Sequence, residues 1–531
     1  MPPSFPLLTP ISMSRKASDQ VHRLIRSMDA AEKRYFKLYA GRHLIQGRSN
    51  HLILFNAIAA MEEYDEEALL RRFKGRGFTA RFAIAKQRLH NTILESLSAY
   101  HAHSSMDARL RRRMHEVEVL YQRALYADAE RHLAGVERLA ARHEKLHVLA
   151  EVQVWRRRLL ERTHYQGANA DTLHDQRERA SWLLARMTEL DALWDLKSEV
   201  FLTLYGEGQA RSIAQVDRVR AIMERPGRPQ VDAHSSAQAR YLHHHLEAVA
   251  GFATGDLEAS HAHLLANRDL LEAERPTFID EPYRLLAVLS NLAYVCTRIG
   301  RFDEAREHLR AYRLAPAAWR MPETEDLEMK LFATGTSLEL SIHCASGEFE
   351  HALAMVPTIE RGLERHGEAL GALRRAGCMF QVAVAHFGGG RPTEALRWCH
   401  RLLNETHQDQ GGIVSYARLL ELMLRLETDD KELLPYTLRN TERYLKGRSR
   451  THRFEQVFLR LVRDLLKPLE PRQQRAAFQR FHDDLAQLAG EPLEQPAFEH
   501  LDPLTWAESH RSGRPYGELV RERARGKSRA A

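Results

Sequence analysis

The stretch LSNLAYVCTRIGRFDEAREHLRAYRLAP, residues 289–316, decides the fold. Apolar residues recur at spacings of three and four on both sides of Gly300, as in two amphipathic helices joined by a tight turn. Ala305 stands on the second helix, where a small side chain lets the two helices approach closely. Pro316 is expected to close the unit because proline cannot continue a helix. The stretch therefore predicts an antiparallel helix pair.

The same turn-and-alanine pattern returns along the chain. It occurs as ALYADAERHL near 124, GDLEAS near 255, GEFEHAL near 347 and GGRPTEAL near 389. This unit resembles the tetratricopeptide repeat, in which each helix hairpin covers the open face of the one before it. The alanine positions 305, 352 and 395 are 47 and 43 residues apart. Since the usual period is about 34 residues, the resemblance implies a variant with long helices.

A broader resemblance covers nearly the whole chain. The order of AAEKRYFKLY, YDEEALLRRF, AKQRLHNTILESLSAYH, the repeats and LTWAESHRSGRPYGELVRERA is similar to a family of bacterial tetratricopeptide-like proteins of unknown role. That family brings no known catalytic residues. The resemblance therefore supports the architecture and implies no mechanism.

The rest of the chain also has helical periodicity, and strand-length alternation and Asn-Gly or Asp-Gly hairpin signals are absent from the sequence. Breaks rich in proline, glycine or polar residues fall at 225–236, 314–326, 407–412 and 491–503. We predict an all-α fold: an α-solenoid of antiparallel helix hairpins, forming a tetratricopeptide-like superhelix behind a basic N-terminal helical module. The expected parts are a disordered extension (1–13), the basic module (14–115), the repeats (116–410), C-terminal helical repeats and cap (411–505), and a basic, partly disordered C-terminal segment (506–531).

Charge is concentrated at the start of the chain. Residues 1–115 hold 20 Lys and Arg against 10 Asp and Glu, whereas the remainder holds 58 against 61. The densest cluster is RLRRRMH, from Arg109 to His115. Such a patch can attract nucleic acid or an acidic protein surface, although a solvated helix face has the same composition. If Arg111, Arg112 and Arg113 form one exposed strip, nucleic-acid binding is favoured.

Two histidine patterns suggest a metal site. The first is RYLHHHLEAVAGFATGDLEASHAHLL, from Arg240 to Leu265. Three consecutive helical residues fan through about 200°, so these histidines cannot converge on one ion. At best one histidine from each helix pairs across the turn, for example His243 with His261. We therefore interpret the stretch as an ordinary repeat.

The second pattern is HEKLH, His143 to His147, which matches the zinc hydrolase motif in which Glu144 would be the general base. Lys145 would place a cation beside the metal, and the match straddles an expected helix connection. No third ligand is evident. We expect no stoichiometric zinc, no cofactor and no catalytic residue.

Four cysteines are scattered through apolar helical stretches without CxxC spacing, which fits a reducing cytoplasm. No window approaches eighteen uninterrupted apolar residues, so no membrane span is predicted. We therefore expect a cytoplasmic protein.

The leading hypothesis is a non-enzymatic scaffold or adaptor that binds a protein or peptide along its concave face. The outward positions of the first helices would contact this partner; they are Arg111, Glu118, Tyr121, Gln122, Ser290, Tyr294, Thr297 and Arg298. An alternative is a nucleic-acid-associated regulator that uses the basic module as contact and the repeats as sensor. A third hypothesis is a zinc metallohydrolase acting through HEKLH. Oligomeric state does not follow from the sequence.

Overall fold

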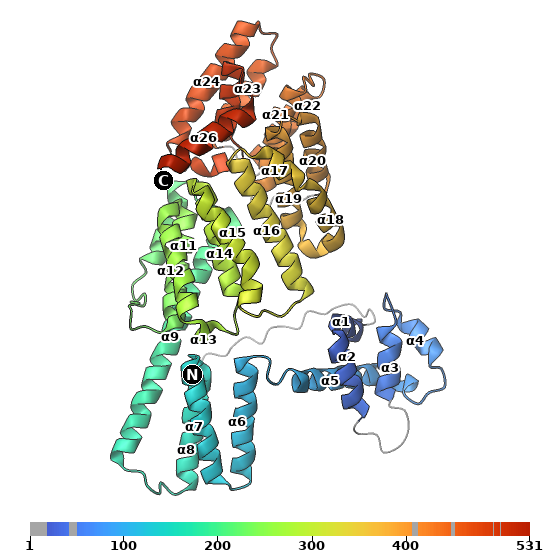
Figure 1. Cartoon of the computed structure of the whole chain (residues 1–531), viewed down its shortest axis with the longest axis vertical. Coiled ribbons are helices and arrows are strands. Elements are labelled where there is room, and N and C mark those ends of the chain that lie inside the picture. Colours follow the sequence, from blue (N-terminus) through green and yellow to red (C-terminus); the bar gives the residue numbers. More distant parts are fainter. Residues whose placement is uncertain are drawn as a thin grey trace. The chain divides into compact units, whose positions relative to one another are not determined.

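The computed structural model describes residues 18–41, 50–405, 412–447, 452–491, 493–499 and 501–530. Helices are the only regular elements in these ranges (Figure 1), which confirms the predicted all-α fold. Within the same ranges, every helix is too short or too polar to cross a lipid bilayer. The expected extension over 1–13 and all but the last residue of the expected break at 407–412 lie outside the described residues.

The chain forms two compact units that divide inside one helix. The first unit ends at Val136 and the second begins at Glu137. The helices of the first unit are α1 (Gln20–Ser27), α2 (Ala30–Gly41), α3 (Asn50–Ala59), α4 (Glu66–Arg72), η1 (Thr79–Arg81), α5 (Phe82–Tyr100), α6 (Met106–Gln122) and the start of α7 (Tyr126–Arg142). Phe36 and Phe55 lie at the centre of its core, with ring centroids 4.4 Å apart.

The second unit contains the histidine-rich stretch and the 289–316 hairpin. Its first helices are α8 (Leu146–Arg162), α9 (Ala170–Glu207), α10 (Ile213–Met223), α11 (Ala237–Thr254), α12 (Leu257–Ala273), α13 (Arg275–Phe278), α14 (Tyr283–Ile299), α15 (Phe302–Ala318) and α16 (Glu325–Ala345). They are followed by α17 (Phe349–Ala354), α18 (Val356–His366), η2 (Gly367–Leu370), α19 (Ala372–Gly388), α20 (Pro392–Glu405), α21 (Ile413–Glu427) and α22 (Leu434–Gly447). The last are α23 (Arg453–Leu465), α24 (Pro471–Ala489), η4 (Gln495–Glu499), α25 (Pro503–Ser512) and α26 (Tyr516–Ala530).

Helices of the second unit pack as successive pairs. Helix α11 packs on α12, α14 on α15, α16 on α17, and α19 on α20. Each pair also contacts the next, through α12 with α14, α15 with α16, and α17 with α19. The small residues predicted to allow close approach are fully buried: Ala129, Ala305, Ala352 and Ala395. The sequence spacing therefore located the hairpins correctly.

One turn conformation joins the helices of most pairs. A glycine with positive φ follows the first helix at Gly300 (83°), Gly347 (76°) and Gly390 (73°). The next N–H then donates to the carbonyl five residues earlier: Arg301 to Cys296 (2.8 Å), Glu348 to His343 (2.8 Å) and Arg391 to His386 (2.9 Å). This hydrogen bond satisfies a carbonyl that the helix end would leave unpaired. Ala124 and Asp429 adopt the same left-handed conformation in turns that lack glycine.

Pro316 does not end its helix, contrary to the prediction. Helix α15 continues to Ala318, and the N–H of Met321 donates to the carbonyl of Pro316 at 2.9 Å. The proline removes one backbone hydrogen bond of the helix, yet the helix ends only two residues later, at Ala318.

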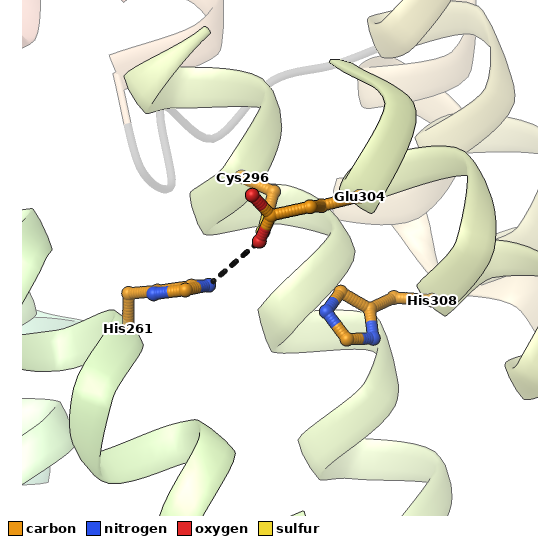
Figure 2. A group of neighbouring side chains, drawn as sticks. All are labelled: His261, Cys296, Glu304 and His308. Carbon is orange, nitrogen blue, oxygen red and sulfur yellow. Dashed lines mark ion pairs between the residues drawn. The ribbon is translucent and has the colours of Figure 1, made fainter. Parts of the chain in front are cut away.

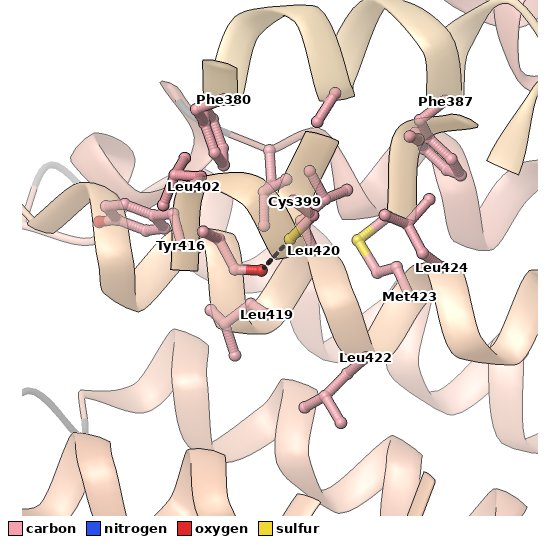
Figure 3. Packing of buried hydrophobic residues seen from close by; sticks show 14 of the residues in the cluster. Phe380, Phe387, Cys399, Leu402, Tyr416, Leu419, Leu420, Leu422, Met423 and Leu424 are labelled. Carbon is pink, nitrogen blue, oxygen red and sulfur yellow. Dashed lines mark hydrogen bonds between the residues drawn. The ribbon is translucent and has the colours of Figure 1, made fainter. Parts of the chain in front are cut away.

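The largest core of the second unit lies around α19, α20 and α21. Helix α21 is buried nearly all round, and Leu419, Leu420, Leu422 and Leu424 are at most 1% exposed. Figure 3 shows these leucines beside Phe380 of α19 and Cys399 of α20. The Cys399 thiol donates to the carbonyl of Ala417 at 3.1 Å. This thiol is therefore part of the packed interior, as the apolar context of the cysteine predicted.

Candidate functional site

The predicted binding residues of α14 are largely occupied by contacts within the protein. Thr297, expected to face outward, is buried, and its hydroxyl donates to the carbonyl of Ala293 at 2.7 Å. Tyr294 is half-buried; its ring lies 6.0 Å from that of Phe252, and the Arg298 guanidinium lies 6.0 Å from the Tyr294 ring. This helix face therefore packs on the preceding hairpin, because α14 is covered by both α11–α12 and α15.

Ser290, the fourth predicted residue of α14, is half-buried, and its hydroxyl donates to the carbonyl of Ala287 at 2.9 Å. It lies three residues before Ala293 and faces the same side of the helix as Tyr294. Thus the four residues share a helix face, but only part of that face reaches solvent.

The predicted residues of α6 lie in the first unit. Arg111 and Gln122 are exposed, and the Gln122 amide donates to Glu118 at 3.3 Å. Tyr121 is half-buried and meets the ring of Tyr126 edge-on, with centroids 5.5 Å apart. Two of these four side chains are thus open to a partner.

Three consecutive arginines of α6, namely Arg111, Arg112 and Arg113, are all exposed. Consecutive helical residues diverge by about 100° each, so the three do not form one narrow strip. Arg112 is also paired with Glu116 at 3.2 Å. The surface is basic but interrupted by acidic neighbours.

The HEKLH string forms a turn. Helix α7 ends at Arg142, α8 begins at Leu146, and Glu144 between them has φ 47°. His143 is buried against the carbonyl of Pro276, whereas His147 is exposed on α8. The two histidines are therefore not one turn apart on a single helix, which confirms that the match straddles a connection.

The other two residues of the string bind neighbouring helices. The Glu144 carboxylate accepts hydrogen bonds from the N–H groups of Ala237 (3.0 Å) and Gln238 (3.2 Å), the first residues of α11. Lys145 forms an ion pair with Asp280 at 2.8 Å, with both side chains almost fully buried. A carboxylate at a helix N-terminus is stabilised by the unpaired N–H groups there. Glu144 and Lys145 thus attach this turn to the hairpins that follow.

The histidine-rich stretch divides between two environments. Its predicted apolar stripe, Leu242, Leu246, Val249 and Ala253, is buried. One histidine from each helix does pair across the turn, but the pair is His244 with His263, whose Nδ1 atoms lie 3.0 Å apart, and not the example of His243 with His261. His261 faces away from α11, toward the next hairpin. An angle of about 100° per residue shows that His261 and His263 point in different directions, but it does not show which of them faces α11 and which faces the next hairpin.

There His261 joins Cys296, Glu304 and His308. One ligand atom from each residue lies within 4.8 Å of the others (Figure 2). His261 comes from α12, Cys296 from the end of α14, and Glu304 and His308 from successive turns of α15. Cys296, His261 and His308 are buried, whereas the Glu304 side chain is about half exposed. The cluster thus lies between two successive hairpins and opens to solvent at the glutamate.

The ring of His261 has two different environments. Its Nε2 lies 3.5 Å from a Glu304 oxygen, the contact drawn dashed in Figure 2, and is buried without a hydrogen-bond partner among the described residues. Its Nδ1 lies 3.3 Å from Arg301, which also pairs with Glu258 at 3.0 Å. A buried nitrogen that faces a carboxylate without a hydrogen bond to it is a candidate for binding a ligand.

Burial keeps the two imidazoles and the thiol of this cluster uncharged. Burial and then Arg268 and His261 lower the pKa of His308 to about 4. Burial and then Arg301 lower the pKa of His261. Burial and then Glu304 raise the pKa of the Cys296 thiol to about 12. At neutral pH the cluster thus presents two neutral imidazoles and a thiol beside Glu304.

A second surface lies on α9, which the sequence analysis did not consider. Seven apolar side chains of this helix are at least 36% exposed. Trp182 lies on the opposite side of the helix from the other six, which are Leu173, Leu184, Met187, Trp194, Leu202 and Tyr205. At 100° per residue they fall within about 80° of the helix circumference. The buried residues Leu193, Leu196 and Val200 point elsewhere. We call these six residues the α9 seam.

The seam has heptad spacing. Leu173, Met187 and Trp194 are separated by multiples of seven residues, as are Leu184 and Tyr205, and these two sets are offset by three. This is the a and d pattern that pairs one helix with another. This heptad spacing can be read in the sequence, but it extends along one continuous helix of 38 residues, which is longer than the hairpin helices that the repeats predict.

Comparison of the whole chain with models of known protein families and with curated proteins found no match, so the site rests on its own geometry.

Proposed function

We propose that this chain is a non-enzymatic scaffold, an α-solenoid of tetratricopeptide-like hairpins in the cytoplasm, and that the α9 seam binds an amphipathic helix of a partner protein. The observation that carries this proposal is the seam itself. Several large apolar side chains exposed along one side of a helix mark an interaction surface. From Leu173 to Tyr205 it runs about 48 Å along the helix at 1.5 Å per residue.

The chemistry of the seam selects a helix as partner. Its heptad spacing offers holes to the side chains of a second helix, and Trp194 and Tyr205 provide the residue types that contribute most to binding. Polar residues Asp191 and Ser198 interrupt it at a positions. Such polar positions fix the register of a helix pair at some cost in affinity. The predicted face at Ser290, Tyr294, Thr297 and Arg298 is a less suitable surface because of its internal contacts.

The test removes two seam side chains and compares a matched pair elsewhere. Leu202 and Tyr205 are 74% and 80% exposed; Leu433 and Tyr436, also three residues apart, are 50% and 60% exposed. A photo-crosslinking amino acid at position 184 identifies the partner segment in the native host, and a synthetic peptide of that segment is then titrated. Leu202→Ser with Tyr205→Ser should weaken peptide binding roughly tenfold or more, whereas Leu433→Ser with Tyr436→Ser should not.

Equal binding by both double variants would contradict the proposal. Crosslinking of the chain to itself would identify a second copy as the occupant. Nucleic-acid binding is the second candidate; Arg111, Arg112 and Arg113 are exposed, although they do not form one strip. It predicts affinity for duplex DNA that falls steeply with salt and is lost when these arginines become glutamine. That outcome would favour nucleic-acid binding over the scaffold proposal.

A further inference from the structure

The cluster of His261, Cys296, Glu304 and His308 has the donor set of a zinc site. Zinc in proteins is bound by thiolate, imidazole and carboxylate groups, almost always four of them in a tetrahedron. We propose that these four side chains bind one Zn²⁺ ion that joins the hairpin α11–α12 to the hairpin α14–α15. This site replaces our expectation of a zinc-free protein, which considered only HEKLH and the consecutive histidines.

The geometry is close to that of a bound ion. Zinc bonds of about 2.0 to 2.3 Å place neighbouring donor atoms about 3.3 to 3.8 Å apart. The four ligand atoms already lie within 4.8 Å of one another, and His261 Nε2 is 3.5 Å from Glu304. Glu304 and His308 are four residues apart on α15, so both project from one face of that helix. Small side-chain rotations therefore suffice to close the shell.

Burial favours metal over water as the occupant. Cys296 is 0% exposed, and His261 and His308 are 4% and 7% exposed, so three of the four donors lie in the protein interior. The buried Nε2 of His261 has no hydrogen-bond partner among the described residues. A metal ion would bind this nitrogen and the thiolate of Cys296, and the thiol proton would be released to solvent. The half-exposed Glu304 provides the route by which the ion enters.

Arg301 is the residue that opposes metal binding. Its guanidinium contacts Nδ1 of His261 at 3.3 Å. A histidine that binds metal through Nε2 carries its proton on Nδ1, so Arg301 must release this atom and keep its bond to Glu258. Arg301→Gln removes the competing donor and offers an amide oxygen to the Nδ1 proton. This substitution should therefore raise metal affinity, which a purely structural cluster does not predict.

The experiment uses Co²⁺ as a spectroscopic probe on the full chain after treatment with chelator. One equivalent should give visible absorption of a tetrahedral ion and a thiolate-to-cobalt charge-transfer band, and Zn²⁺ should abolish both. Cys296→Ser should lose the charge-transfer band, and His308→Ala should weaken binding roughly tenfold or more. Zn²⁺ should also raise the melting temperature of the wild-type chain.

A second polar cluster supplies the matched control. His343, Glu348 and His351 also place ligand atoms within 4.8 Å of one another, but without a cysteine. His343→Ala with His351→Ala should keep the charge-transfer band at full intensity. Circular dichroism of every variant checks that it folds. The proposal is overturned if the wild-type chain gives no stoichiometric band, if the band survives in Cys296→Ser, or if Arg301→Gln weakens binding.

Discussion

Replacing Gly388 by alanine tests how the C-terminal helix α26 is attached. A Cβ atom at Gly388 would lie 2.0 Å from Cε1 and 2.3 Å from Cζ of the Phe349 ring. Gly517 of α26 meets the same group, because a Cβ there would lie 2.7 Å from the Gly388 carbonyl and 3.2 Å from Phe349 Cδ2. Phe349 is 2% exposed, so its ring has little room to move. The added methyl group must displace the ring or α26.

The loss of stability in Gly388→Ala can be compared with the effect of the same substitution at Gly335, a helical glycine with room for a Cβ atom. Overpacking of a buried site costs about 1 to 3 kcal/mol, while alanine gains at most about 1 kcal/mol over glycine in a helix. Gly388→Ala should therefore destabilise the second unit by about 1 to 2 kcal/mol. Gly335, inside α16, has its nearest neighbours at 3.8 Å. Gly335→Ala should retain the propensity gain and stabilise by about 0.5 to 1 kcal/mol.

Thermal melting followed by circular dichroism should show shifts of opposite sign for the two variants. Limited trypsin digestion locates the effect, because α26 carries Arg521 and Arg523. Cleavage there should accelerate in Gly388→Ala and stay unchanged in Gly335→Ala. If Gly388→Ala melts at or above the wild-type temperature with α26 still protected, the Phe349 ring does not fill the space beside Gly388 and the reasoning is refuted.

Two further predictions concern buried charge in the second unit. Arg211 forms ion pairs with Glu455 at 2.7 Å and Glu494 at 2.8 Å, and all three side chains are at most 12% exposed. Because Arg211→Met leaves two buried carboxylates without their partner, it should lower the free energy of unfolding in urea by about 3 to 5 kcal/mol. If replacing all three residues by apolar ones recovers none of this loss, the unpaired carboxylates are not its cause. Burial, then Lys197 and Arg284, lower the pKa of His245 to about 4. The neutral imidazole therefore contributes its full stability above pH 6.5, the approximate pKa of histidine in the unfolded chain, and this contribution is lost as the pH falls from there toward 4. His245→Phe should flatten the decline in melting temperature between pH 7 and pH 5, and parallel declines would contradict the assignment.

Local pattern was enough to predict the helices and their pairing. Gly300 and Ala305 specify a turn and a close contact within thirty residues of chain, so the α14–α15 hairpin follows from sequence alone. Glu144 and Ala124 show where this fails: both adopt positive φ without being glycine, because two packed helices impose the turn on the residue between them. The boundary at Pro316 was wrong for a related reason, since a helix can extend past a proline in its last turn.

The candidate sites were harder to predict because they depend on helix rotation. His261 and His263 differ by two positions, about 200° around α12, yet one faces Cys296 and the other faces His244. The sequence cannot decide between them without knowing which side of α12 the next hairpin covers. The α9 seam was missed for a different reason. Its heptad spacing is present in the sequence. However, α9 has more than one apolar side, and the tertiary packing decides which side stays exposed. Here the side that carries Leu193 and Val200 is buried.

The proposed zinc site and the second polar cluster differ in how their carboxylates are paired. With the 47-residue spacing of the repeat, Cys296 corresponds to His343, and Glu304 corresponds to His351. The second junction is held by Arg306, which pairs with Glu348 at 2.9 Å, and by His343, which contacts the same carboxylate at 2.8 Å. That carboxylate is already shared between two cationic or donor groups, so little of its charge remains for a metal ion. At the first junction Arg301 binds Glu258 instead, and Glu304 is left facing His261. On the proposed assignment, corresponding positions in successive hairpins form a metal site where the carboxylate is left without an arginine, and an ion-paired contact where an arginine takes it.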